Sequence, residues 1–228
     1  MLYFVASEQA LGEVMRIISR RRVVYAPVPE PADQQEGEKA NFHLERAETW
    51  DAARHTIAPY RTVEPLKQVV FPPREFLGRL WENGTREPEE RVVIGVKNCD
   101  LAALRVHDYV FLESPPDNGY AALRRNTLIV SADCTDCRDV CFCSAVGEQP
   151  YPVKGFDINI SPIPDGWLLE AGSERGERLL GAASDLLQEA GEEQKRQRDE
   201  ARSRLREKVQ RRRRSTGWRR TRTTGQRS

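Results

Sequence analysis

Five cysteines are the residues of this 228-residue chain best suited to chemistry, and all lie in one central segment. Cys99 stands in KNCDLAAL, and Cys134, Cys137, Cys141 and Cys143 follow in SADCTDCRDVCFCSAVG. From Cys134 the spacing is C-x2-C-x3-C-x-C. Thiolates that converge from short loops bind soft metals, and a [4Fe–4S] cluster takes four of them. The pattern therefore predicts a metal centre on these cysteines, and it favours an iron–sulfur cluster.

Two other interpretations of the cysteines stay open. A C-x2-C pair can clamp a structural zinc ion, although this chain lacks the second, well-separated C-x2-C pair of a zinc ribbon. A thiol redox protein could use Cys134 with Cys137, or Cys141 with Cys143. The spacing also differs from the bacterial ferredoxin run C-x2-C-x2-C-x3-C-P. A disulfide scaffold is disfavoured, because an odd number of cysteines is confined to one segment.

The segments that must position these cysteines are two buried strands. RVVIGV (91–96) and NTLIVSADC (126–134) are apolar and rich in β-branched residues, which is typical of strands covered on both faces. Each runs into a loop that carries a cysteine. In open α/β sheets, sites gather at the carboxyl ends of the strands. We therefore expect Cys99 and Cys134 to lie near each other.

The remaining patterns predict an α/β fold, with a mixed sheet, flanking helices and cysteine-rich loops at strand ends. The sheet and its helices are expected to form one domain over residues 1–185. Further strands are predicted at 23–28 and within 155–170, and helices at 10–22, 74–81 and 101–113.

The composition changes towards the C-terminus. Residues 186–210 carry mixed charges and predict a charged helical segment, whereas 211–228, with RRRRSTGWRRTRTTGQRS, predict a disordered basic tail. Such a tail could contact nucleic-acid phosphates. Acidic residues interleave with the basic ones up to Glu207, and Trp218 is the tail's one aromatic residue for base stacking. A solvated terminus is therefore the preferred interpretation, and nucleic acid is not an expected partner.

Other candidates for chemistry are weaker. His43, His55 and His107 are scattered in sequence, and His107 is expected at the surface or as a cap rather than as a ligand. Asp100 is expected to stabilise a helix start. The chain has no Gly-rich phosphate-binding motif, so no nucleotide site is predicted. With no general acid, base or nucleophile to assign, the chain is not expected to be catalytic on its own.

The rest of the sequence bears on location. The net charge is +1, so no strong field acts on a distant partner. The N-terminus lacks the pattern of a signal peptide, and no apolar run reaches the ~20 residues of a membrane span. We expect a soluble, cytoplasmic protein.

Several segments together resemble a known family. They are TVEPLKQVVFPPREFL, GVKNCDLAAL, RRNTLIVSADC, VCFCSAVG and GFDINISPIPDGWLLEAGSERGE. They are similar to the β subunits of cytoplasmic sulfhydrogenases and to the related A subunit of anaerobic sulfite reductase, which are 4Fe–4S dicluster-domain proteins. The resemblance covers roughly residues 1–185, and its most specific parts are Cys-Phe-Cys and the Cys-Asp at a strand end.

The resemblance implies an iron–sulfur electron-transfer subunit of a multisubunit oxidoreductase. Such subunits relay electrons between a flavin-containing, NAD(P)H-reactive partner and a catalytic hydrogenase or sulfite reductase subunit. By the matching motifs, the ligands would be Cys99, Cys134, Cys141 and Cys143, with Cys137 as an extra thiol.

The chain departs from the family pattern at its C-terminus. Members of the family usually continue into a ferredoxin module with two further cysteine runs, whereas no cysteine follows Cys143 here. The sequence-based expectation is a truncated or out-of-frame end beyond about residue 210.

Overall fold

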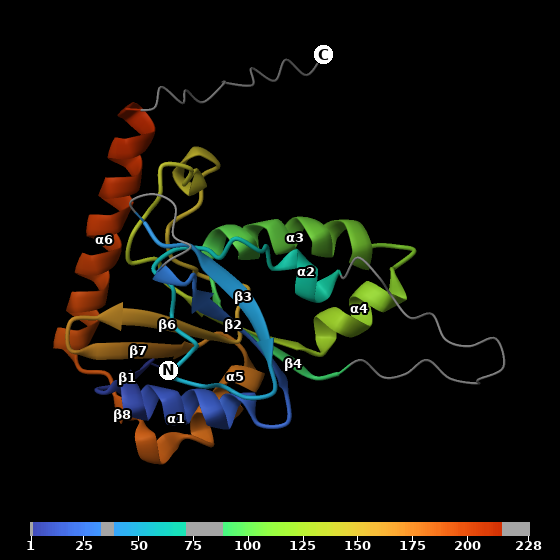
Figure 1. Ribbon diagram of the computed structural model, residues 1–228, viewed down its shortest axis with the longest axis horizontal. Helices are drawn as coiled ribbons and strands as arrows, with labels where there is room; N and C mark the ends of the chain where they lie inside the picture. The colour runs from blue at the N-terminus through green and yellow to red at the C-terminus, as the bar shows by residue number, and fades with distance from the viewer. Residues whose placement is uncertain (1, 33–38, 72–88, 216–228) are drawn as a thin grey trace.

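The computed structural model describes residues 2–32, 39–71 and 89–215, with side chains as far as residue 212. Within these ranges, eight strands form one mixed sheet in the order β3-β2-β4-β5-β6-β7-β1-β8 (Figure 1). The strands are β1 (Leu2–Val5), β2 (Val23–Pro29), β3 (Phe42–Ala47), β4 (Arg91–Val96), β5 (Thr127–Ala132), β6 (Ile158–Ile163), β7 (Gly166–Ala171) and β8 (Gln188–Glu189). Strands β2, β4, β5 and β6 run parallel, and the outer pairings are antiparallel. The predicted α/β class with a mixed sheet is confirmed.

Helices cover both faces of the sheet in the described ranges (Figure 1). They are α1 (Glu8–Ser19), α2 (Lys67–Val70), α3 (Asn98–Leu112), α4 (Asn118–Arg125), α5 (Glu174–Gly181) and α6 (Glu192–Ser215). Helices α1 and α5 pack on one face, and α2, α3 and α4 pack on the other. None of these helices combines the length and apolar composition needed to cross a membrane.

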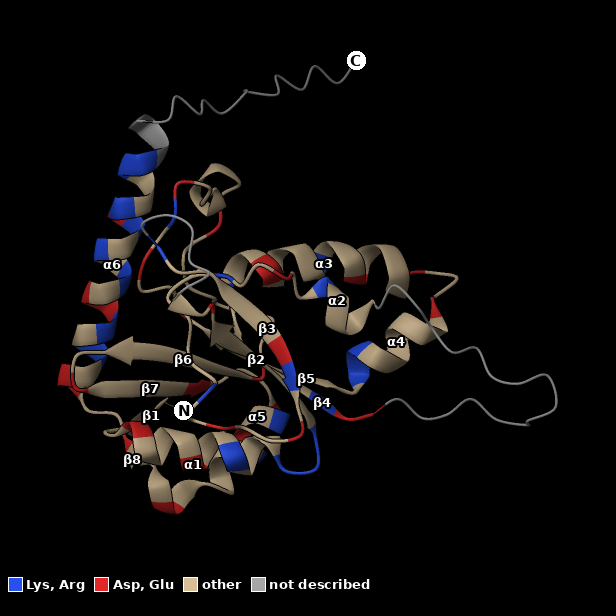
Figure 2. Cartoon of the chain, in the orientation of Figure 1, with Lys and Arg blue, Asp and Glu red and all other residues tan. Residues whose placement is uncertain are grey.

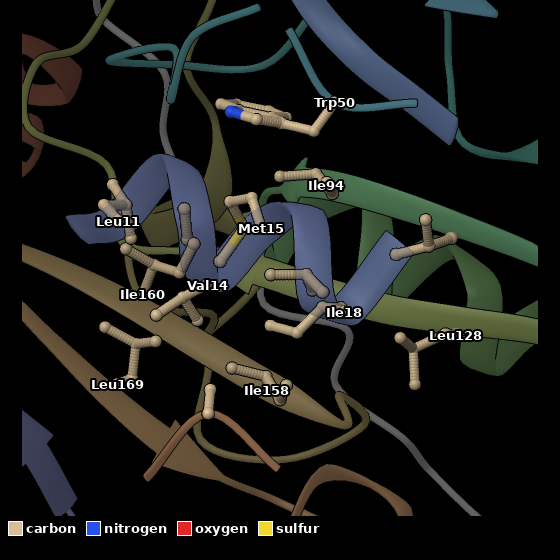
Figure 3. Close-up of a cluster of buried hydrophobic side chains, with 14 of the residues drawn as sticks. Leu11, Val14, Met15, Ile18, Trp50, Ile94, Leu128, Ile158, Ile160 and Leu169 are labelled. Atoms are coloured by element: carbon tan, nitrogen blue, oxygen red, sulfur yellow. The ribbon is translucent and has the colours of Figure 1, made fainter. Parts of the chain in front are cut away.

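The core follows from the alternation of side chains along the two central strands. In β4, Val92 and Ile94 point toward α1, whereas Val93 points toward the α3 face. Helix α1 contributes Met15 and Ile18, which are fully buried against the sheet (Figure 3). Because both faces of β4 and β5 are covered, neither strand shows a polar side, as the sequence predicted.

The first helix has clear local start and stop signals. The Ser7 hydroxyl accepts a hydrogen bond from the Ala10 amide at 3.1 Å, which caps the N-terminus of α1. The helix ends at Ser19, three residues before the predicted end, and Arg21 follows with a φ of +62°. A left-handed residue cannot continue a right-handed helix, so the chain turns there into β2.

Several parts of the fold were not specified by the sequence patterns. The sequences of β1 and β3 have weak or ambiguous periodicity. Each becomes a strand by pairing with a neighbour, β1 with β7 and β3 with β2. The helix expected at 74–81 lies outside the described residues. Helix α6 spans the expected boundary at residue 210 and continues to Ser215, while residues 216–228 of the expected tail lie outside the described ranges.

Candidate metal centre

All five cysteines line one cavity of 860 Å³. Its lining residues come from the start of α3, the long loop after β5, residues 60–63 and α6. The first two of these directly follow the parallel strands β4 and β5. The five cysteines are free of disulfides. Residues that are up to 44 positions apart in sequence are therefore assembled around a single space.

Two neighbouring strands bring Cys99 and Cys134 to this cavity. Strands β4 and β5 pair in parallel, and Val96 lies opposite Ser131. Cys99 falls in the first turn of α3, directly after β4, and Cys134 follows β5. The Cys134 amide donates to the Pro150 carbonyl at 2.9 Å, which fixes the loop as it leaves the sheet. The proximity expected from the strand pattern is therefore present.

The loop after β5 folds back to supply the other cysteines. The Cys141 amide donates to the Arg138 carbonyl at 3.0 Å, and the Arg138 amide donates to Cys141 Sγ at 3.2 Å. Cys143 opens a short 3-10 helix, Cys143–Ala145, and its carbonyl accepts the Glu148 amide at 2.9 Å. An amide that donates to sulfur stabilises negative charge on it, which suits a metal-bound thiolate.

Cys137 differs from the other four in its surroundings. It is buried against Leu205 and Val209 of α6, and its side chain is 1% exposed. The amide of Cys137 is bound by the Asp136 carboxylate at 2.7 Å. Cys137 therefore serves as a packing residue between the cysteine loop and α6, while it still borders the cavity.

Burial makes the thiols hard to ionise without a metal. It raises the pKa of Cys134 to about 12, and neighbouring Cys141 and Cys143 add to the rise. Burial also raises the pKa of Cys99, Cys137 and Cys143 above the ordinary value. Crowded thiols cannot all become thiolates in a low-dielectric site unless cationic charge is added, and a metal centre supplies that charge.

A buried lysine lies beside the cysteines. Lys97 precedes α3, is 1% exposed, and donates from Nζ to the Asp133 carbonyl at 3.1 Å. Burial lowers its pKa, while nearby Cys134, Asp133 and Cys99 oppose that shift. A buried ammonium needs anionic neighbours, and bound thiolates would provide them.

The three histidines lie away from the cavity. No histidine of the described residues lines the cavity. His43 contacts Glu64 with Nδ1 at 2.8 Å, and His55 accepts the Asp51 amide at 2.9 Å. His107 packs at 6.2 Å from the Phe111 ring. Asp100 lies in the first turn of α3, where its carboxylate is 4.0 Å from Cys99 Sγ.

The donors are spread around the cavity and do not converge on one point. In the described part of the chain, no three His, Cys, Asp or Glu side chains lie close enough together to share a single metal ion. A cubane cluster makes a different demand, because each of its four irons takes one thiolate. Five thiols around one cavity, with Lys97 beside them, fit such a cluster in donor type and number.

Comparison with known proteins gives one informative match. No family model matches the chain, and no solved structure matches it. The chain is 32% identical over 139 residues to a protein named sulfhydrogenase 2 subunit beta from Pyrococcus furiosus. The resemblance to a sulfhydrogenase β subunit is confirmed. The match covers 60% of this chain and 41% of that sulfhydrogenase subunit, so the chain aligns with less than half of its relative's length.

Neither the motifs nor the sulfhydrogenase resemblance pointed to three residues that hold the site. Lys97 stands two residues before Cys99 and Asp133 directly before Cys134, and a charged residue at the end of a buried strand is a usable signal for both. Arg202 lies in a run of mixed charges and gave no such signal, yet it binds Asp133 at 2.7 Å. Its partner is 69 residues away, and only the folded chain places the two side by side.

Proposed function

We propose that this chain is an electron-transfer subunit of a multisubunit oxidoreductase and that it holds one [4Fe–4S] cluster. The observation that carries the proposal is the cavity lined by all five cysteines. The similarity to a protein named as a sulfhydrogenase subunit supports the oxidoreductase context. When bound, such a cluster supplies one-electron transfer.

The ligands in this proposal are Cys99, Cys134, Cys141 and Cys143. All four line the cavity, as Cys137 does. Cys137 is 1% exposed and packs on Leu205 and Val209 of α6, so we take it as the extra thiol. The proposed set thus combines one cysteine from the start of α3 with three from the loop after β5.

The protein would tune the site through its own charges and amides. Lys97 places a buried cation beside the thiolates, which offsets part of their negative charge and favours the reduced state. The Arg138 amide donates to Cys141 Sγ and acts in the same direction.

The partners we propose are a flavin-containing, NAD(P)H-reactive subunit and a catalytic hydrogenase or reductase subunit. Electrons would pass between them through this chain, and its own residues would carry out no bond-making step. Five free thiols around one cavity suit a reducing compartment, so we place the complex in the cytoplasm.

Metal and sulfide analysis of the full chain, purified without oxygen, tests the proposal. We expect about four irons and four acid-labile sulfides per chain, and a broad visible absorbance that bleaches with dithionite and returns on reoxidation. Stoichiometric zinc without colour would contradict the proposal and would support a structural zinc module. A metal-free chain with a reversible dithiol would also contradict it, and would support thiol redox chemistry.

A further inference from the structure

Helix α6 lies along the cysteine loop, although its composition predicted only a charged helical segment. Basic residues recur along the helix, and acidic residues lie in the loop beside it (Figure 2). Leu205 and Val209 are buried against Cys137. Lys208 donates to Asp136 at 2.6 Å, and Arg212 pairs with Asp139. These contacts recur every three or four residues, so one face of α6 covers the loop.

The most buried ion pair that the structure describes on α6 joins Arg202 and Asp133. The Arg202 guanidinium donates from Nε to Asp133 Oδ2 at 2.7 Å and from Nη2 to Asp133 Oδ1 at 3.1 Å. The two side chains are 14% and 7% exposed. The Arg202 guanidinium also lies 4.6 Å from the centre of the Tyr151 ring. A guanidinium that is held by a carboxylate at its edge and by an aromatic ring over its face has little freedom to shift.

Asp133 precedes Cys134, and all of its polar atoms are engaged. Its amide donates to the Ile160 carbonyl at 2.9 Å, and its carbonyl accepts from Lys97 Nζ. Its Oδ1 also accepts from Asn159 Nδ2 at 3.0 Å. Asp133 thus joins β6, the start of α3 and α6 at the residue next to a proposed ligand.

We propose that Arg202 is a positioning residue for the metal centre, which it serves by fixing Asp133 and thereby the direction of Cys134. This inference rests on the proposed function, because it assigns Arg202 to the site that holds the cluster. Without Arg202, the carboxylate of Asp133 is buried without its cation, and the backbone before Cys134 loses one of its anchors. Helix α6 thus lines the cavity that holds the proposed metal centre.

The test compares Arg202→Met with Arg202→Lys and with a matched control, Arg204→Met. Arg204 is on the same helix, but its side chain is 67% exposed and its ion pair with Glu200 spans 3.8 Å. Lysine keeps the positive charge at position 202 but cannot form the two parallel hydrogen bonds of a guanidinium. Far-UV circular dichroism of each full-length variant checks that the fold is retained.

The first measurement is the alkylation rate of each cysteine in the metal-free chain, read by peptide mass spectrometry. We expect Arg202→Met to speed alkylation of Cys134 several-fold, Arg202→Lys to lie between, and Arg204→Met to match the unchanged chain. A merely structural role would raise the rates of all five cysteines together. Equal rates at Cys134 in the Arg202 and Arg204 variants would overturn the inference.

The second measurement is made on the reconstituted chain. Loss of a partner that orients a metal ligand weakens metal retention by about tenfold, so we expect Arg202→Met to lose iron to a chelator about ten times faster than Arg204→Met. We also expect its reduction potential to shift, with partial recovery in Arg202→Lys. Iron retention and potential equal to the control would overturn the inference. If the unchanged chain takes up no iron and sulfide, the proposed function fails, and the alkylation rates still decide the role of Arg202.

Discussion

Cys134→Ser is expected to lose the iron–sulfur cluster, with iron per chain after anaerobic reconstitution reduced by about tenfold or more. Cys134 is a proposed ligand that lies two residues after the end of β5. Its amide donates to the Pro150 carbonyl at 2.9 Å, which fixes its backbone. A serine hydroxyl is a hard, weakly acidic donor that replaces a thiolate poorly at iron. Colorimetric iron and sulfide assays, with the visible spectrum, measure the loss.

The matched control is Cys137→Ala. Alanine removes the extra thiol and keeps a small apolar side chain against Leu205 and Val209. We expect this variant to keep its iron, sulfide and colour, with a modest loss of stability from the smaller side chain. If Cys137→Ala loses the cluster while Cys134→Ser retains it, the ligand assignment is wrong.

Gly176→Ala is expected to cost about 3 kcal/mol of unfolding free energy and to lower Tm by roughly 6–12 °C. A Cβ at Gly176 in α5 would lie 1.9 Å from the Asp157 carbonyl oxygen. Asp157 cannot yield easily, because its carboxylate accepts the Ile129 amide at 2.8 Å and the Ser173 hydroxyl at 2.7 Å. Thermal unfolding followed by circular dichroism measures the change.

Gly181→Ala, at the other end of the same helix, is the control. A Cβ there meets no atom within 4 Å. Alanine is the better helix former, so we expect a gain of about 0.5 kcal/mol. Equal and small effects at both positions would show that α5 does not approach Asp157 as closely as described.

The parts of the site near the buried strands could be predicted from the sequence. The apolar runs of β4 and β5 predict buried strands, because strands covered on both faces have no polar side. Their shared carboxyl edge then brings Cys99 toward Cys134. Local composition also marks the cysteine loop as a site, since polar residues surround its thiols.

The contribution of α6 could not be predicted in the same way. Its sequence is dominated by charges, and Leu205 and Val209 are too few to reveal a buried face. The helix is held instead by ion pairs with Asp133 and Asp136, whose partners lie far away in sequence. Long-range polar pairs leave no periodic pattern, so the composition indicated only a charged helical segment.

The central claim is that the cysteine cavity holds one cubane cluster, and the Mössbauer spectrum of the full chain reconstituted with ⁵⁷Fe tests it most directly. We predict that the iron signal belongs to a [4Fe–4S] cluster, and that it changes by one electron on reduction. A spectrum of isolated iron in a four-thiolate site, or the absence of bound iron in a folded chain, would contradict the account.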